Sequence, residues 1–228
     1  MNIPAITKEQ MAEVDRLAIE RGLQIRQMME HAGLHLARVA FDNREGDAPA
    51  VVLCGRGNNG ADGIAAARFL SNWGLEVEIV LATPEEKLNE HGQHHLAMAK
   101  QIGCAVHEKS ETEKPSVVVD ALLGYSIEGD PRGSFVELIE WANVKSAPVV
   151  SCDNPSGLEV TQGKIGNPTV KATHTVTLGL PKTGLQRPEA AEYVGTLWLA
   201  DLGIPDFIYM ELGIPVSHVF EKGSIVKM

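Results

Sequence analysis

The feature that most constrains this chain is a series of short apolar runs, each followed by a polar, glycine-bearing loop or a helical pattern. The runs lack the strict apolar–polar alternation of half-exposed strands, which is typical of strands buried on both faces. Helical patterns separate the first four runs, and strand–helix–strand alternation implies right-handed crossovers between parallel strands. We therefore predict an α/β fold, a three-layer sandwich with a mostly parallel central sheet. The apolar runs lie at 51–54, 77–82, 116–123, 148–152, 173–180 and 195–202, and the helical patterns at 61–73, 86–102 and 133–144.

Two further helical patterns precede the first run. Thr7 to Gln10 has the spacing of a capping box, and apolar residues follow at helical intervals until Gly22. A second pattern runs from 24 to 42, and its Ala32-Gly33 pair indicates close packing against another element. With no repeat and no linker-like stretch, we expect one domain over residues 1–228 that carries N-terminal helices.

Charge and hydropathy exclude several classes of partner. The formal net charge of −10 and the lack of a basic run argue against nonspecific binding of nucleic acid. No apolar run approaches membrane-spanning length, and the first ten residues lack a signal-peptide pattern. The three cysteines lie in apolar runs without a CxxC motif, so we interpret them as buried, reduced thiols. We expect a cytoplasmic protein that binds neither membrane nor nucleic acid.

The loop Gly55–Gly60 formally matches GxGxxG between a strand and a helix, which is a weak phosphate-binding signal when taken alone. A nicotinamide dehydrogenase also needs an acidic residue at the end of the next strand, and that strand ends at Thr83 without one. A standard oxidoreductase is therefore disfavoured. The Asn58-Asn59 pair offers carbonyl oxygens that suit a hard cation, or it caps the following helix.

Two carboxylates follow buried runs farther along the chain. Asp120 ends VVVD, and Asp153 opens the turn DNPSGL that also holds Ser156. Ligands bind beyond the carboxyl ends of parallel strands, so these groups can converge with Asn59 at one crevice. Two adjacent carboxylates repel each other unless a cation or a shared proton relieves them, which makes a monovalent cation plausible. The alternative is that each residue caps a loop or a helix.

Three other polar or sulfur-bearing features have competing interpretations. Lys182 lies in the loop LPKTGL. It either approaches the phosphate or the reacting group of a ligand, or is an exposed lysine in a turn. In HGQHH, the first and last histidines share a helix face, but without a third ligand we interpret His91, His94 and His95 as solvated. We interpret the Met28-Met29 pair as core.

Taken in order, the motifs GNNGADG, VDALLG with GDPRG, DNPSGL and PKTGL, together with AEVDRLAIE, MMEHAG and DLGIP, make this chain resemble the NAD(P)HX epimerase family, also called the YjeF N-terminal domain. The resemblance covers nearly the whole chain. It implies a Rossmann-like fold, often a homodimer, and interconversion of the R and S forms of hydrated NADH and NADPH in nicotinamide nucleotide repair, with a separate dehydratase acting downstream. The alternatives are a noncatalytic nucleotide- or protein-binding module on the same fold and a nucleotide-dependent oxidoreductase.

The resemblance also implies roles for individual residues. It implies one potassium ion per subunit, and we assign proton transfer to Asp153 and Asp120. If the ion holds Asp120, Asp153 is the freer of the two to move a proton. The potassium ligands would be Asn59, Asp120 and Ser156. The dinucleotide contacts would be Asn58, Asn59, Gly60, Ala61, Asp62, Gly124, Tyr125, Ser126, Ile127, Glu128, Gly129, Asp130 and Asp153.

Four residues, at three places in the chain, depart from the family pattern. Ala61 stands in place of a usual glycine, Tyr125-Ser126 in place of Thr-Gly, and Thr173 where aspartate is frequent. The second change is expected to alter the shape of the pocket.

Overall fold

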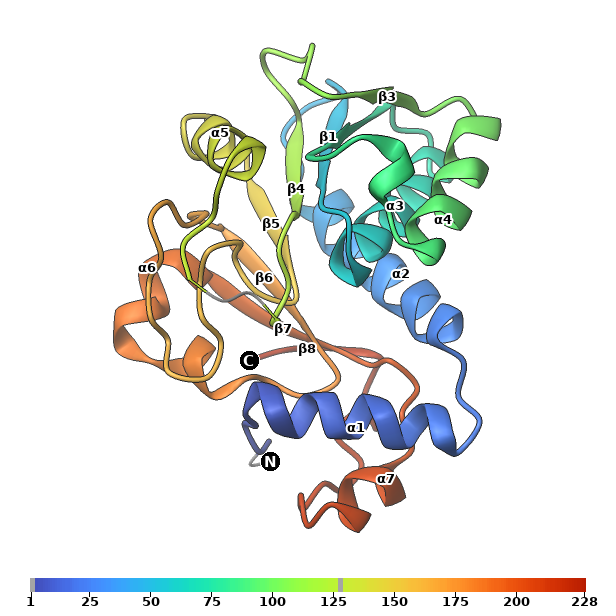
Figure 1. The fold of residues 1–228 in the computed structure, drawn as a ribbon, viewed down its shortest axis with the longest axis vertical. Helices are drawn as coiled ribbons and strands as arrows, with labels where there is room; N and C mark the ends of the chain where they lie inside the picture. Colours follow the sequence, from blue (N-terminus) through green and yellow to red (C-terminus); the bar gives the residue numbers. More distant parts are fainter. Residues whose placement is uncertain (1–2, 127–128) are drawn as a thin grey trace.

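The computed structural model describes residues 3–126 and 129–228, and its centre is a single eight-stranded sheet (Figure 1). The strand order is β3-β2-β1-β4-β5-β6-β7-β8, and within it only the β7–β8 pair is antiparallel. The predicted α/β class with a mostly parallel sheet is therefore confirmed. The strands are β1 (Ala50–Cys54), β2 (Val77–Leu81), β3 (Ala105–His107), β4 (Val117–Ala121), β5 (Val149–Cys152), β6 (His174–Leu178), β7 (Thr196–Ala200) and β8 (Ile225–Lys227).

Helices cover both faces of the sheet and make the two outer layers of the sandwich. The larger core packs α1, α2, α3, α4 and α7 against one face, and a smaller core packs α5 against the other. Figure 1 shows α5 and α6 on the opposite side of the sheet from α2, α3 and α4. The helices are α1 (Lys8–Glu20), α2 (Ile25–Asn43), α3 (Asn58–Asn72), α4 (Glu90–Gln101), α5 (Ser134–Asn143), α6 (Ala191–Val194) and α7 (Asp206–Glu211), with 3₁₀ turns η1 (Glu85–Lys87), η2 (Thr183–Gln186) and η3 (Pro188–Ala190).

The two N-terminal helices form where the sequence predicts them. Thr7 Oγ1 accepts from the backbone N–H of Gln10 at 3.3 Å, and Gln10 Oε1 accepts from the N–H of Thr7 at 2.9 Å, which completes the capping box. In α2, a Cβ built on Gly33 would lie 2.6 Å from the Cβ of Ala65 in α3. Glycine is therefore needed for α2 and α3 to approach this closely, as the Ala32-Gly33 pair indicates.

Four short elements escape the sequence patterns, namely β3, β8, α6 and α7. Both strands have three residues, and none of those residues is buried, so neither strand has the apolar run that marks the inner strands. The predicted helix over 86–102 is divided, because the chain leaves η1 before Asn89 caps α4 through its side chain. None of the helices in the described ranges combines the length and apolar character needed to cross a bilayer.

The strand order places a topological switch point between β1 and β4. From β1 the chain builds β2 and β3 on one side, and it then returns to place β4 on the other side. The loops that leave β1 and β4 therefore diverge, which opens a crevice at the carboxyl ends of these strands. The N-terminal segment meets the same edge, because Ile6 donates to Pro181 O at 2.9 Å and accepts from Thr183 N at 2.9 Å.

Candidate active site

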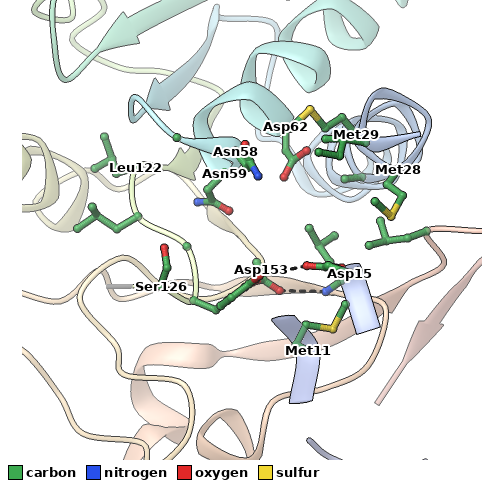
Figure 2. Close-up of a pocket in the computed structure, with 18 of the residues that line it drawn as sticks. Met11, Asp15, Met28, Met29, Asn58, Asn59, Asp62, Leu122, Ser126 and Asp153 are labelled. Atoms are coloured by element: carbon green, nitrogen blue, oxygen red, sulfur yellow. Dashed lines mark hydrogen bonds between the residues drawn. The ribbon is translucent and has the colours of Figure 1, made fainter. Parts of the chain in front are cut away.

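A cavity of about 650 Å³ lies at this switch point, which is the size of pocket that takes a small organic ligand (Figure 2). One wall is apolar and comes from α1 and α2. The opposite walls are polar and come from the loops after β1, β4, β5 and β6. The lining residues are Met11, Asp15, Ile19, Ile25, Met28, Met29, Ala32, Arg56, Gly57, Asn58, Asn59, Asp62, Thr83, Leu122, Leu123, Gly124, Tyr125, Ser126, Phe135, Asp153, Leu178, Lys182 and Leu202.

The first loop turns sharply from β1 into α3, and two of its glycines are required by close backbone contacts. A Cβ on Gly55 would lie 1.9 Å from the carbonyl oxygen of Leu122, and one on Gly60 would lie 1.8 Å from that of Gly55. This packing aims the N-terminus of α3 at the cavity. Asn58 and Asn59 line the cavity there, and Arg56 lies beside them. The free N–H groups of a helix N-terminus favour an anionic ligand such as a phosphate.

Asp120 is the next-to-last residue of β4, is fully buried and is held by four hydrogen bonds. Ser156 donates from its hydroxyl at 2.6 Å and from its backbone N–H at 2.9 Å, Ser151 Oγ donates at 2.8 Å, and Leu122 N donates at 3.3 Å. Burial raises the pKa of Asp120, and these hydrogen bonds act against that rise. Asp120 does not line the cavity, so its carboxyl lies behind the cavity wall.

The three predicted cation ligands gather around the loop that follows β4. Asp120 and Ser156 are in direct contact, and Ser156 Oγ also accepts from Leu123 N at 2.9 Å. Asn59 packs against Gly124, the residue after Leu123, since a Cβ built on Gly124 would lie 3.4 Å from Asn59 Oδ1. The three predicted ligands therefore belong to one neighbourhood of the fold.

Two observations fit a monovalent cation in this neighbourhood. Within the described residues, no lysine or arginine forms a salt bridge with the buried Asp120 carboxyl. In addition, Asn59 Nδ2 is buried without a hydrogen-bond partner. A rotation of that amide would present its oxygen to a cation instead, and hard monovalent ions take oxygen ligands of this kind.

Asp153 and Lys182 form a buried ion pair on the floor of the cavity. Lys182 Nζ donates to Asp153 Oδ1 and also to the carbonyl oxygen of Leu178 at 2.9 Å. The two side chains are only 1% and 5% exposed for Lys182 and Asp153 respectively. The interpretation of Lys182 as an exposed lysine in a turn is therefore wrong. Its side chain is buried, and the carboxylate that pairs with its ammonium group comes from the loop after β5.

Asp153 has a strained backbone in addition to its buried side chain. Its φ angle is +63°, a left-handed conformation that residues other than glycine rarely adopt. Its N–H donates to Val176 O at 2.8 Å, and its Oδ1 accepts from Leu178 N at 3.2 Å, so contacts with β6 hold it there. Strain of this kind is concentrated at functional sites.

A second carboxyl on this floor comes from α1. Asp15 Oδ2 accepts from the hydroxyl of Tyr125 at 3.1 Å. The pKa of Asp15 is raised to about 6, and burial is the largest cause. Lys182 and the Tyr125 hydroxyl act to lower it, and the charge of Asp153 acts to raise it. Sequence reasoning missed Asp15. The available signal was an acidic residue four positions after Met11, on the face of the helix that buries apolar residues.

A third carboxyl, Asp62, lies nearer the N-terminus of α3. Figure 2 shows it close to Met29 and above Asp15 and Asp153 in that view. Burial raises the pKa of Asp62 well above its ordinary value, and the negative charges of Asp153 and Asp15 raise it further.

Among the described residues, some of the predicted dinucleotide contacts line the cavity and others do not. Several of them do not line the cavity. Gly60 and Ala61 are buried in the first turn of α3, and Gly129 and Asp130 are exposed, with Asp130 Oδ1 accepting from Asn167 N at 3.0 Å. Ile127 and Glu128 lie outside the described residues. The predicted contacts that line the cavity are Asn58, Asn59, Asp62, Gly124, Tyr125, Ser126 and Asp153.

Other side-chain predictions have mixed outcomes. The three cysteines are free and buried, as predicted. His95 is only 3% exposed, so the prediction that all three histidines are solvated is wrong for this one, because His95 lies on the inner face of α4 near Glu30. Within the described ranges no group of three His, Cys, Asp or Glu side chains is placed to hold a metal ion. Met28 and Met29 are buried core residues that also line the cavity.

This fold and site define a doubly wound α/β protein that has a ligand cavity at its switch point and buried carboxyls at its strand ends. The family described as YjeF-related protein N-terminus matches residues 25–184, and the chain belongs to this family.

Curated relatives extend the likeness to nearly the whole chain. The NAD(P)H-hydrate epimerase of Dehalogenimonas lykanthroporepellens is 38% identical over 234 residues, which cover 99% of this chain and 93% of the relative. The NAD(P)H-hydrate epimerase of Entamoeba histolytica is 31% identical, over 95% of this chain and 98% of the relative. The bifunctional NAD(P)H-hydrate repair enzyme Nnr of Salinibacter ruber is 34% identical over 90% of this chain, which spans 42% of that longer protein.

A solved structure shares the fold. The crystal structure of yeast ynu0 superposes with a TM-score of 0.84 at 23% sequence identity, covering 99% of this chain and 100% of the yeast chain. The Rossmann-like three-layer architecture is thus common to both.

Proposed function

We propose that this protein is an NAD(P)H-hydrate epimerase, an isomerase that interconverts the R and S forms of hydrated NADH and NADPH. Relatives with that name match it over nearly their whole length at 31–38% identity. The observation that carries the proposal is that the cavity joins a helix N-terminus to a buried carboxyl at a strand end, Asp153. The first suits a pyrophosphate, and the second suits proton transfer at a ring.

The cavity gives the substrate one orientation. The pyrophosphate would lie near Arg56 and the first turn of α3, and the hydrated ring would lie over the ion pair of Asp153 and Lys182. Met11 and Leu178 line the same cavity and would exclude water from the ring. Asn58, Asn59, Gly124 and the neighbouring loop residues would contact the parts between.

The substrate carries a hydroxyl on the carbon beside the ring nitrogen. Inversion by ring opening requires a base to take the hydroxyl proton, and Asp153 is the cavity carboxyl that pairs with an ammonium group, that of Lys182. Asp120 is buried behind the cavity wall and held by Ser156, which makes it a structural carboxylate and not the proton carrier. Asp153 is therefore the residue to which we assign the base.

We also propose that Asn59, Asp120 and Ser156 hold one potassium ion. Bound there, the ion would neutralise Asp120 and fix the loop after β4 against α3. A thermal-shift titration tests this without any assay of activity. Potassium chloride should raise the melting temperature more than sodium chloride at equal ionic strength, and Asp120→Asn should abolish the difference. Equal effects of the two salts on the wild-type protein would rule out a selective site.

Incubation of the purified protein with the separated R or S hydrate of NADH tests the main proposal. Chromatography should show each epimer approaching the same equilibrium mixture far faster than in buffer alone. Asp153→Asn should lose most of this rate while keeping a cooperative melt. If the wild-type protein leaves each epimer unchanged, the proposal fails, and an absorbance change coupled to an oxidisable substrate would instead indicate an oxidoreductase.

Partners and location follow the family. We expect a cytoplasmic homodimer, with a separate dehydratase acting downstream on the hydrated nucleotide. Size-exclusion chromatography with light scattering tests the dimer.

A further inference from the structure

We propose that Asp15 is the second proton-transfer residue of this site, working as the acid while Asp153 works as the base. This inference rests on the proposed epimerase function and adds a residue to it. It starts from a geometric fact: the cavity floor holds two carboxyls, contributed by α1 and by the loop after β5, with one ammonium group paired to only one of them.

The position of Asp15 suits this role. It lines the cavity beside Met11 and Ile19, which flank it by one helical turn on each side. Its Oδ2 is occupied by the Tyr125 hydroxyl, and within the described part of the chain its Oδ1 has no hydrogen bond. Figure 2 shows the carboxyls of Asp15 and Asp153 at the same level of the pocket. One oxygen of Asp15 is thus positioned by the protein, and the other is left for a ligand.

Asp15 and Asp153 contact different kinds of group. Lys182 donates directly to Asp153, whereas the group that touches Asp15 is a neutral hydroxyl. Burial raises the pKa of Asp15 to about 6, near the pH at which a proton carrier is most efficient. Asp62 is less suited, because it lies on α3, away from the contacts that join Asp15 to Tyr125 and Asp153 to Lys182. The ionisable groups around Asp15 are Tyr125, Lys182, Asp153, Asp62 and, from α7, Tyr209.

Ring opening needs both an acid and a base, as the proton balance shows. Asp153 takes the proton of the ring hydroxyl, the C–O bond becomes a carbonyl, and the adjacent C–N bond breaks. The electron pair of that bond passes to the ring nitrogen, which receives the proton of Asp15. After rotation about the C–C bond, the nitrogen attacks the other face of the aldehyde. The nitrogen then returns its proton to Asp15, and the new hydroxyl takes the proton back from Asp153, so no oxidant or reductant is required.

The test compares Asp15→Asn with wild type and with Asp42→Asn, a matched change at an exposed residue of α2. Asparagine keeps an oxygen for the Tyr125 hydroxyl but carries no transferable proton. We expect kcat to fall roughly 10²–10⁴-fold with KM changed less than about threefold, as for loss of a general acid. We expect Asp42→Asn to match wild type. Both variants should keep a cooperative melt.

The pH profile separates proton transfer from a structural role. In wild type, kcat/KM should fall as the pH rises above about 6, since Asp15 loses its proton there. Asp15→Asn should lack that limb. The Tyr125 hydroxyl lowers the pKa of Asp15, so Tyr125→Phe should move the limb to higher pH.

Carboxyl carbon NMR gives a readout that is independent of turnover. A signal that titrates near pH 6 in wild type should be absent from Asp15→Asn. If wild type interconverts the epimers while Asp15→Asn keeps its rate and its pH profile, Asp15 has no role in proton transfer and the epimerase assignment stands. A wild-type protein without epimerase activity instead overturns the function on which this inference rests.

Discussion

The buried pair of Lys182 and Asp153 predicts that replacing the lysine destabilises the whole protein. Lys182→Met keeps the length of the apolar stem but leaves Asp153 as a buried carboxylate whose remaining side-chain contact is Leu178 N at 3.2 Å. Removing one partner of a buried ion pair costs about 3–5 kcal/mol. Thermal unfolding entropy is about 2.1 cal/mol/K per residue, or about 0.5 kcal/mol/K for 228 residues. The melting temperature should therefore fall by about 6–10 °C.

A double-mutant cycle tests the cause of that loss. Differential scanning calorimetry at pH 7.5 would compare wild type, Lys182→Met, Asp153→Asn and the double variant. Because the double variant has no unpaired charge, it should recover at least half of the loss seen in Lys182→Met. Lys171→Met is the matched control, since Lys171 pairs with Glu192 in solvent, and it should change the melting temperature by less than about 2 °C. A Lys182→Met protein that melts within about 2 °C of wild type would refute the reasoning.

Four further outcomes follow from the packing, the burial and the capping of the fold. Gly33→Ala places a Cβ 2.6 Å from that of Ala65, so urea denaturation should show a loss of about 1–3 kcal/mol, and an unchanged midpoint would contradict the close packing of α2 on α3. Burial raises the pKa of all three thiols, so a thiol reagent should label none of them in the native protein and three after denaturation. The pKa of Asp15 rises from 3.8 to about 6 on folding, which means that the folded state binds more protons between these values and stability falls as pH rises through them; Asp15→Asn should therefore melt above wild type at pH 7.5, by a margin that shrinks towards pH 4. Thr7→Ala removes the cap of α1 and should cost about 1 kcal/mol in the same denaturation assay, whereas Thr7→Ser should cost less.

The inner strands and their loops could be predicted from sequence because their signals are local. Most inner strands are rich in apolar residues, and acidic residues mark two of their carboxyl ends, since Asp120 is the next-to-last residue of β4 and Asp153 directly follows β5. The switch-point rule then brings those ends together without any knowledge of side-chain contacts. The grouping of Asn59, Asp120 and Ser156 follows from this rule.

The remaining features depend on contacts between segments that are distant in sequence. Lys182 becomes a buried residue only because Asp153, 29 positions earlier, neutralises it. Asp15 joins the site because α1 crosses the carboxyl edge of the sheet, and no local pattern gives the direction in which a helix crosses. His95 has the sequence context of a surface histidine, and its burial depends on how α4 packs. Short edge elements such as β3 lack a periodic pattern altogether.

The pairing of Ile6 with the segment that carries Lys182 has a consequence for biosynthesis. A nascent chain exposes residue 6 long before residues 181–183 leave the ribosome, so the first helix must wait, undocked, until most of the sheet has been translated. An affinity tag added ahead of Ile6 would join the chain close to the segment that pairs with residues 181–183, whereas a carboxy-terminal tag would follow the edge strand β8. Recombinant protein for enzymology is therefore better tagged at its carboxy terminus.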